Sequence, residues 1–241
     1  MASHSPEDSQ RLAARIAGFT LLLLIFSGML STFVFHPQLL VEGNPAATLQ
    51  NILNHDRIYR ISIAMGIVMF NCDIALAVAL YALLKPTNGP LALLGTIWRS
   101  ANAIVLGSSV GLSLVILELP RAPAYLAALP APQMMAVVKL LSAVAGHSSS
   151  IGLIFFCLGA GVHSWLLFKS RYIPRILSGF YLFCCVEMLT FCFLFLIFPA
   201  LNATIGWWFV FPDFFAELFT ALWLAFKGAN IPQRQVTLSE S

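Results

Sequence analysis

Four charged side chains interrupt long apolar runs of the sequence. They are Asp73, Arg99, Glu187 and Glu217. On insertion scales, an Asp or Arg at the centre of a membrane helix costs about 2.5–3.5 kcal/mol, so each is expected to face neighbouring helices and to find a partner there. Such groups either hold helices together or form a site for a ligand, a proton or a substrate. The chemistry they suggest is ion pairing, proton binding and acid–base catalysis by carboxyl groups.

Asp73 and Arg99 are expected to form a salt bridge. Only the short turn Lys85–Pro90 separates their helices, so the two helices should be antiparallel neighbours. At about 1.5 Å per residue, Asp73 lies about 17 Å from the turn and Arg99 about 12 Å into the next helix. The long arginine side chain can reach across this offset of about 5 Å, and its geometry with a carboxylate can be bidentate.

Glu187 and Glu217 fall at a similar depth in their own apolar runs. Glu187 lies about 17 Å into its segment and Glu217 about 14 Å from the end of its segment. All four charges therefore share one slab near the middle of the bilayer. Because three acids face one arginine, at least one carboxyl group is expected to be protonated.

Helical spacing places further polar residues on the same helix faces as these charged residues. One stripe holds Arg99, Asn102, Ser109 and Ser113, and another holds Asp213, Glu217 and Thr220. Pro212 directly precedes Asp213, so that helix is expected to kink or to begin again there. Asn102 and Asp213 therefore join the four charged residues as candidates for a ligand or proton site.

No metal, haem or other cofactor is expected. His147 and His163 are sixteen residues apart, which places them about 160° apart around a helix and so on opposite faces. No metal-binding, nucleotide-binding or nucleophile-elbow motif occurs. The five cysteines lie in apolar runs without a C-x-x-C pair and are interpreted as small buried apolar residues: Cys72, Cys157, Cys184, Cys185 and Cys192.

Composition identifies the elements that must position these groups. Of the 241 residues, 59% are apolar and 10% are charged, and the mean hydropathy is +0.87. A water-soluble globule of this size could not hide so much apolar surface, and a disordered chain would be polar and highly charged. The net charge of +3 is too small and too scattered for nucleic acid binding. An integral membrane protein remains.

The apolar runs predict an all-α polytopic bundle of six transmembrane helices, because each is long enough to cross a bilayer and lacks the alternation of barrel strands. The spans are 16–35, 61–84, 91–119, 151–168, 176–198 and 203–226. The apolar stretch 133–145 is either an interfacial helix or the beginning of the fourth span. Gly107-x-x-x-Gly111 permits a close helix approach, either within the bundle, which we expect, or between protomers.

Six spans place both termini on one side of the membrane. The segments on that side carry eight basic residues and the opposite segments carry four, so both termini are expected in the cytoplasm. The chain then divides into a polar tail at 1–15, a membrane domain at 16–228 and a second polar tail at 229–241.

Several short motifs, taken in order, resemble one bacterial membrane family. They are Asp73, Tyr81–Pro86, Leu91–Leu94 with Arg99, Ser170 with Ile173–Leu177, Ala216–Leu218, Leu222–Leu224 and Lys227–Gly228. The family is catalogued as domain of unknown function 4386. Its likeness implies a multi-pass protein of the bacterial inner membrane, and no activity. It also implies that Arg60 and His163 join Asp73, Arg99 and Glu217 as polar positions, whereas Arg171 replaces an expected small residue such as glycine.

Three functions remain open from the sequence. The bundle could bind or transport a small lipid-like or protonatable ligand at the polar level, with the lipid bilayer as its other partner. It could be an intramembrane enzyme in which Glu187 or Glu217 acts as general acid or base on a lipid substrate. It could also be an accessory or structural membrane subunit whose charges serve assembly alone.

Overall fold

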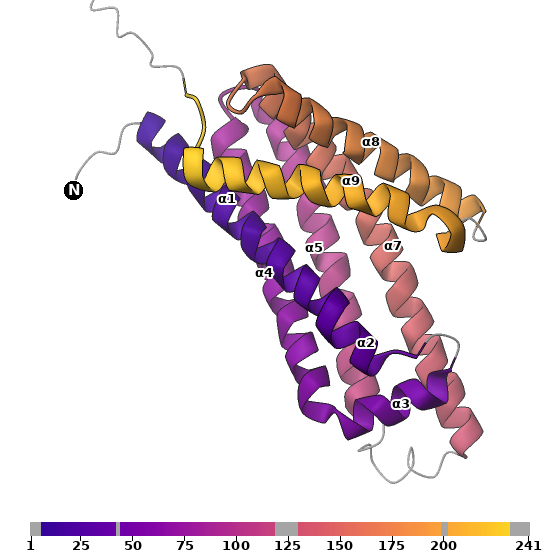
Figure 1. The fold of residues 1–241 in the computed structure, drawn as a ribbon. Helices are drawn as coiled ribbons and strands as arrows, with labels where there is room; N and C mark the ends of the chain where they lie inside the picture. The colour runs from indigo at the N-terminus through magenta and orange to yellow at the C-terminus, as the bar shows by residue number, and fades with distance from the viewer. Residues whose placement is uncertain (1–5, 42–43, 119–129, 199–201, 232–241) are drawn as a thin grey trace, which may run out of the picture.

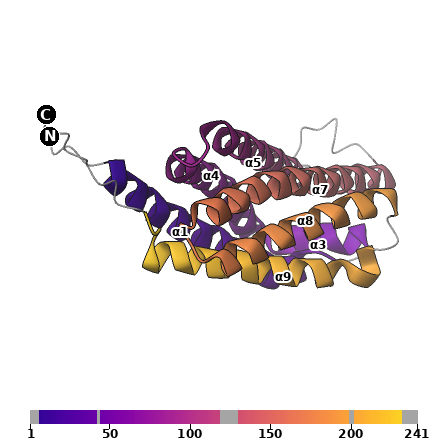
Figure 2. The same ribbon diagram turned by 90° about the horizontal axis from the view of Figure 1, so that it is seen from above.

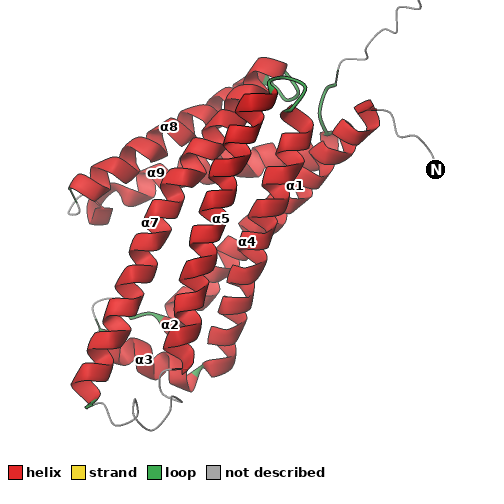
Figure 3. Cartoon of the chain, turned by 180° about the vertical axis from the view of Figure 1, so that it is seen from behind, coloured by secondary structure: helices red, strands yellow, loops and turns green. Residues whose placement is uncertain are grey.

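The computed structural model describes residues 6–41, 44–118, 130–198 and 202–231. These residues are helical apart from short connections, and no strand occurs among them, which confirms the all-α prediction (Figure 3). The ends of both expected polar tails, 1–5 and 232–241, lie outside the described residues. From Pro6 onward, the residues of the first expected tail form the first turns of α1.

Eight α-helices and two short π-helical segments follow one another along the described chain. They are α1 (Pro6–Leu30), η1 (Ser31–Phe35), α2 (His36–Leu39), α3 (Pro45–Asn54), α4 (Asp56–Leu84), α5 (Gly89–Glu118), α7 (Ala131–Ser170), α8 (Arg175–Ile197), α9 (Asn202–Leu222) and η4 (Trp223–Lys227). The two η segments are π-helical turns that continue α1 and α9. Asn44 and Asn88 accept hydrogen bonds from Ala47 N and Leu91 N, both at 3.1 Å, and so cap the starts of α3 and α5.

Five stretches of helix among the described residues are long and apolar enough to cross a membrane. They are Glu7–Leu39, Asp56–Leu84, Gly89–Glu118, Pro132–Ser170 and Arg175–Ile197. Their outward faces carry large apolar side chains; Ile176, for example, is 88% exposed. The protein is therefore a multi-pass membrane protein. The segment expected to be the sixth span corresponds to α9 with η4, and its crossing of the membrane stays a prediction.

The six long helices form a closed ring. Contacts run from α1 to α4, α5, α7, α8 and α9 in turn, and α9 with η4 returns to α1. Seen from above, α4, α5 and α7 form one layer, and α1, α8 and α9 form the other (Figure 2). Helices α8 and α9 run side by side and cover only one end of α5 and α7, whereas α2 and α3 lie at the other end (Figure 1). The described ends of the chain, at the start of α1 and just after η4, lie at the same end of the bundle.

Helix α7 is continuous over 40 residues. At about 1.5 Å per residue it is about 60 Å long. The stretch 133–145 therefore continues into the fourth span as one helix rather than forming a separate interfacial helix. Val138 in this stretch is buried in one apolar cluster with Ile116 and Leu117, near the end of α5.

The close helix approaches occur at other glycines than the expected pair. A Cβ atom on Gly159 of α7 would lie 2.8 Å from Gly95 O and 2.9 Å from Arg99 N of α5, so these two backbones touch. A Cβ atom on Gly18 of α1 would overlap the backbone at Ala225 of η4. By contrast, a Cβ on Gly107 would make only ordinary contact with Phe70, and one on Gly111 would meet nothing within 4 Å. The expectation of a close helix approach within the bundle at Gly107-x-x-x-Gly111 is therefore wrong.

Arg171 ends α7 in a left-handed backbone conformation with φ of 59°. This conformation is strained for a residue with a Cβ atom and is usually taken by glycine at this position of a helix end. The strain explains why a small residue is expected here.

Substituting Arg171→Gly is expected to raise the free energy of unfolding by about 0.5–1 kcal/mol, because relief of strain exceeds the entropy that glycine adds to the unfolded chain. Thermal unfolding of the purified protein in detergent measures the change. Arg171→Ala keeps the Cβ atom and removes the charge, so it serves as the control and should show no gain. An equal gain in both variants would assign the effect to charge instead.

Candidate functional site

The expected salt bridge between Asp73 of α4 and Arg99 of α5 is present at the centre of the ring. Arg99 Nε donates to Asp73 Oδ1 at 2.5 Å, and each residue is only 1% exposed. Asn102 Nδ2 donates to the other oxygen, Asp73 Oδ2, at 2.6 Å. The pair is not bidentate: Arg99 donates to Oδ1 alone, and Oδ2 accepts from Asn102. Both donors lie on the face of α5 that the sequence predicts to be polar.

Glu217 of α9 extends this pair into a network. Its Oε1 lies 3.9 Å from Arg99 Nη2 and accepts a hydrogen bond from the Tyr181 hydroxyl of α8 at 3.0 Å. The Arg99 guanidinium also lies over the Phe156 ring of α7, 5.0 Å from its centroid, in a cation–π contact. One arginine thus contacts side chains from α4, α7 and α9, and α8 joins through Tyr181.

Tyr181 is a member of the network that the sequence does not reveal. It lies in an apolar segment where an aromatic residue is ordinary. Its one signal is the buried face of α8 at helical spacing, shared with Cys184, Cys185 and Met188. A hydroxyl on that face needs a buried partner, and Glu217 supplies it.

A partly open cavity of about 230 Å³ lies beside the network. Side chains from α1, α4, α5, α7 and α9 line it: Leu24, Met69, Asp73, Asn102, Leu106, Ser149, Leu153, Phe156, Asp213 and Glu217. Carboxylate and amide groups occupy part of this wall, and apolar side chains occupy the rest. The arrangement suits a small molecule with one polar end and one apolar end.

Asp213 is the lining residue whose hydrogen bonding is incomplete. It lies one turn before Glu217 on α9 and is 8% exposed, and its Oδ1 is buried without a hydrogen-bond partner. A buried carboxylate oxygen without a partner is costly. Three carboxyl groups, those of Asp73, Asp213 and Glu217, line the cavity, and Arg99 is the cation next to Asp73 and Glu217.

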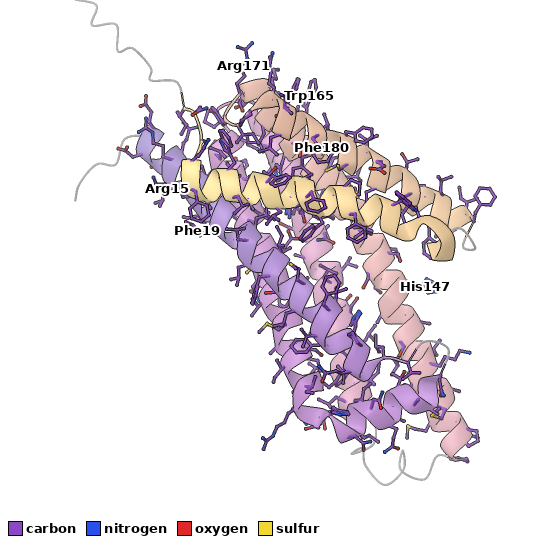
Figure 4. All side chains as sticks on the ribbon, viewed as in Figure 1. Arg15, Phe19, His147, Trp165, Arg171 and Phe180 are labelled. Atoms are coloured by element: carbon purple, nitrogen blue, oxygen red, sulfur yellow. The ribbon has the colours of Figure 1, made fainter. Side chains whose placement is uncertain are left out.

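The remaining candidates lie outside the cavity wall. Glu187 of α8 is half-buried and does not line the cavity. His163 of α7 is buried against Gly95 of α5. His147 of the same helix is exposed and is labelled in Figure 4. Arg60 is exposed near the start of α4, about 20 Å along the helix from Asp73, where it pairs with Asp56 at 3.0 Å and Glu118 at 3.4 Å.

The site's chemistry comes from carboxyl groups. Within the part of the chain that the structure describes, no three His, Cys, Asp or Glu side chains come together as metal ligands. All five cysteines are buried free thiols, as predicted. Carboxylates that face a cavity with an apolar wall can bind a proton or a cationic group.

Comparison with known proteins adds one finding. No curated protein and no solved structure matches the chain. A family model described as a domain of unknown function, number 4386, matches residues 16–228, which include every residue of the network and of the cavity wall. The chain therefore belongs to the domain of unknown function 4386 family.

Proposed function

We propose that this membrane protein binds a small amphipathic cation, a protonated amine with an apolar body, in the cavity beside Asp213 and Glu217. The observation that carries the proposal is the buried Asp213 Oδ1, which has no partner and belongs to the cavity wall. An ammonium group would donate the missing hydrogen bond. We place the protein in a bacterial inner membrane with both termini in the cytoplasm.

The charges around the cavity favour a cation. Asp73 is matched by Arg99 at 2.5 Å, whereas Glu217 is 3.9 Å from the same arginine and Asp213 has no ion pair among the described side chains. A bound cation, or a proton in its absence, offsets the excess of acid in a medium of low dielectric constant.

The apolar wall favours an alkyl or aromatic body on the ligand. Leu24, Leu106, Leu153 and Phe156 line the cavity together with the acids. A volume of about 230 Å³ is below the usual range for drug-sized ligands, so the ligand is small.

Octylamine and octanol test this proposal, because they share a chain and differ in charge at neutral pH. The purified protein should be stabilised by octylamine, by about 2.7 kcal/mol at a concentration one hundred times the dissociation constant, and little by octanol. Asp213→Asn should weaken octylamine binding at least about ten-fold, since it removes a charged partner. Glu187→Gln is the matched control and should bind octylamine as the parent does.

Two results would overturn the proposal. Equal stabilisation by octanol would show that the cavity selects the chain and not the charge. Unchanged octylamine binding by Asp213→Asn would show that the amine binds elsewhere. If that variant instead lost stability and neither probe bound, the carboxyl groups would be interhelical contacts, as expected of an accessory subunit.

A further inference from the structure

A second cavity, of about 570 Å³, lies at the end of the bundle where α1 begins and η4 ends. Its wall consists of Asp8, Arg11, Leu12, Arg15, Lys227, Gly228, Ala229, Asn230 and Ile231. Apart from both including residues of α1, it has nothing in common with the first cavity. We propose that this second cavity binds the phosphate group of an anionic phospholipid.

The cations of this wall come from two segments that are distant in the sequence. Arg11 and Arg15 are one turn apart on α1, and Lys227 ends η4, with its Nζ 4.2 Å from the centre of the Trp223 ring. With Asp8 as the single acid in the lining, the wall carries a net charge of +2 from its three cations and one anion. Guanidinium groups bind phosphate oxygens through paired hydrogen bonds, so this wall is suited to a phosphate.

The backbone on the η4 side is held in place. Gly228 N donates to Trp223 O at 3.0 Å, and Asn230 N donates to Tyr172 O at 2.9 Å, in the connection between α7 and α8. Gly228 has a φ of 74°, which turns the chain sharply after Lys227. The packing of η4 on α1 at Gly18 fixes Lys227 relative to the two arginines.

Exposed apolar side chains continue from the cations toward the middle of the bundle. Phe19 lies one turn after Arg15 and is 53% exposed, and Phe226 of η4 is 69% exposed. Their rings are 6.0 Å apart, edge to face. Figure 4 shows Arg15 and Phe19 in this order along α1. Cations followed by exposed aromatic rings match a phosphate followed by acyl chains, whereas a soluble phosphate would make no use of the rings.

Native mass spectrometry of the full chain from bilayer discs tests the proposal. The discs contain equal amounts of phosphatidylglycerol and phosphatidylcholine. The parent protein should retain phosphatidylglycerol, and the variant Arg11→Gln/Arg15→Gln/Lys227→Gln should lose this preference by at least about ten-fold, given the contribution of each cation near a membrane surface. The control Lys169→Gln/Arg171→Gln/Arg175→Gln removes three charges at the same end of the bundle and should keep the preference.

A second variant separates lipid from free phosphate and does not change the charge. Phe19→Ala/Phe226→Ala should weaken retention of phosphatidylglycerol. Inorganic phosphate is then added to the parent protein at about 10 mM, which is enough to fill a weak anion site. It should neither displace the lipid nor raise the melting temperature. Displacement by inorganic phosphate would assign the cavity to a soluble anion. An equal loss of phosphatidylglycerol in the control variant would assign retention to general surface charge. Either result overturns the proposal.

Discussion

Replacing Arg99 by leucine is expected to lower the free energy of unfolding by about 3–5 kcal/mol. The substitution leaves the buried Asp73 carboxylate without its 2.5 Å partner and removes the cation nearest to Glu217. The cost arises mainly from the carboxyl groups left uncompensated in the ring, and less from the lost attraction itself. Thermal or denaturant unfolding of the purified protein in detergent measures it.

Arg60→Leu is the matched control, because it removes an arginine of α4 that is exposed and pairs with Asp56 and Glu118 at the surface. Surface pairs contribute about 0–1 kcal/mol, so this variant should unfold almost like the parent. The variant Asp73→Asn/Arg99→Gln removes both buried charges and should be more stable than Arg99→Leu. A double-mutant cycle on Asp73 and Arg99 that showed no coupling would contradict the role given to this pair.

The substitution Gly159→Ala is expected to have the second largest effect on stability. It should lower the free energy of unfolding by about 1–3 kcal/mol or more. The added methyl group would lie 2.8 Å from Gly95 O and 2.9 Å from Arg99 N, so α5 and α7 must move apart. Backbone atoms cannot yield as the end of a flexible side chain does. Because Arg99 itself lies at the contact, the shift should also weaken octylamine binding in the neighbouring cavity.

Gly111→Ala is the matched control, and its expected effect on the free energy of unfolding has the opposite sign. A Cβ atom there meets nothing within 4 Å, and alanine favours a helix over glycine by about 0.5–1 kcal/mol. This variant should therefore be as stable as the parent or slightly more stable. If Gly159→Ala and Gly111→Ala unfold alike, the proposed contact between the α5 and α7 backbones does not determine stability.

The Asp73–Arg99 contact was predictable because a short turn joins the two helices. The turn makes them antiparallel neighbours, and the helical rise then sets the relative depth of the two side chains. Nothing comparable links α5 to α8 or α9. Depth alone placed Glu187 and Glu217 at one level, but the rotation of each helix decides which carboxyl group faces the cavity, and that rotation depends on packing against several neighbours.

Two other features could not be predicted from the sequence, for related reasons. A G-x-x-x-G pattern shows that a close approach is permitted, and it does not say whether a helix lies on that face. At Gly107 and Gly111 no backbone comes close, whereas the single glycines Gly95 and Gly159 touch across two helices. The length of α7 was open because the polar cluster His147–Ser150 separates the apolar residues after Gln133 from the fourth predicted span, although no proline interrupts the helix.

The unequal lengths of the helices have a consequence for the surrounding bilayer. Helix α8 has 23 residues and α4 has 29, or about 35 Å and 44 Å of helix. Lipids beside α4 and lipids beside α8 thus meet walls of different height, and bilayers adapt to such mismatch by thinning or thickening locally. The protein should therefore be surrounded by an uneven belt of lipid, thinner along α8 than along α4. Membrane thickness would then influence the tilt of α8, whose Tyr181 donates a hydrogen bond to Glu217.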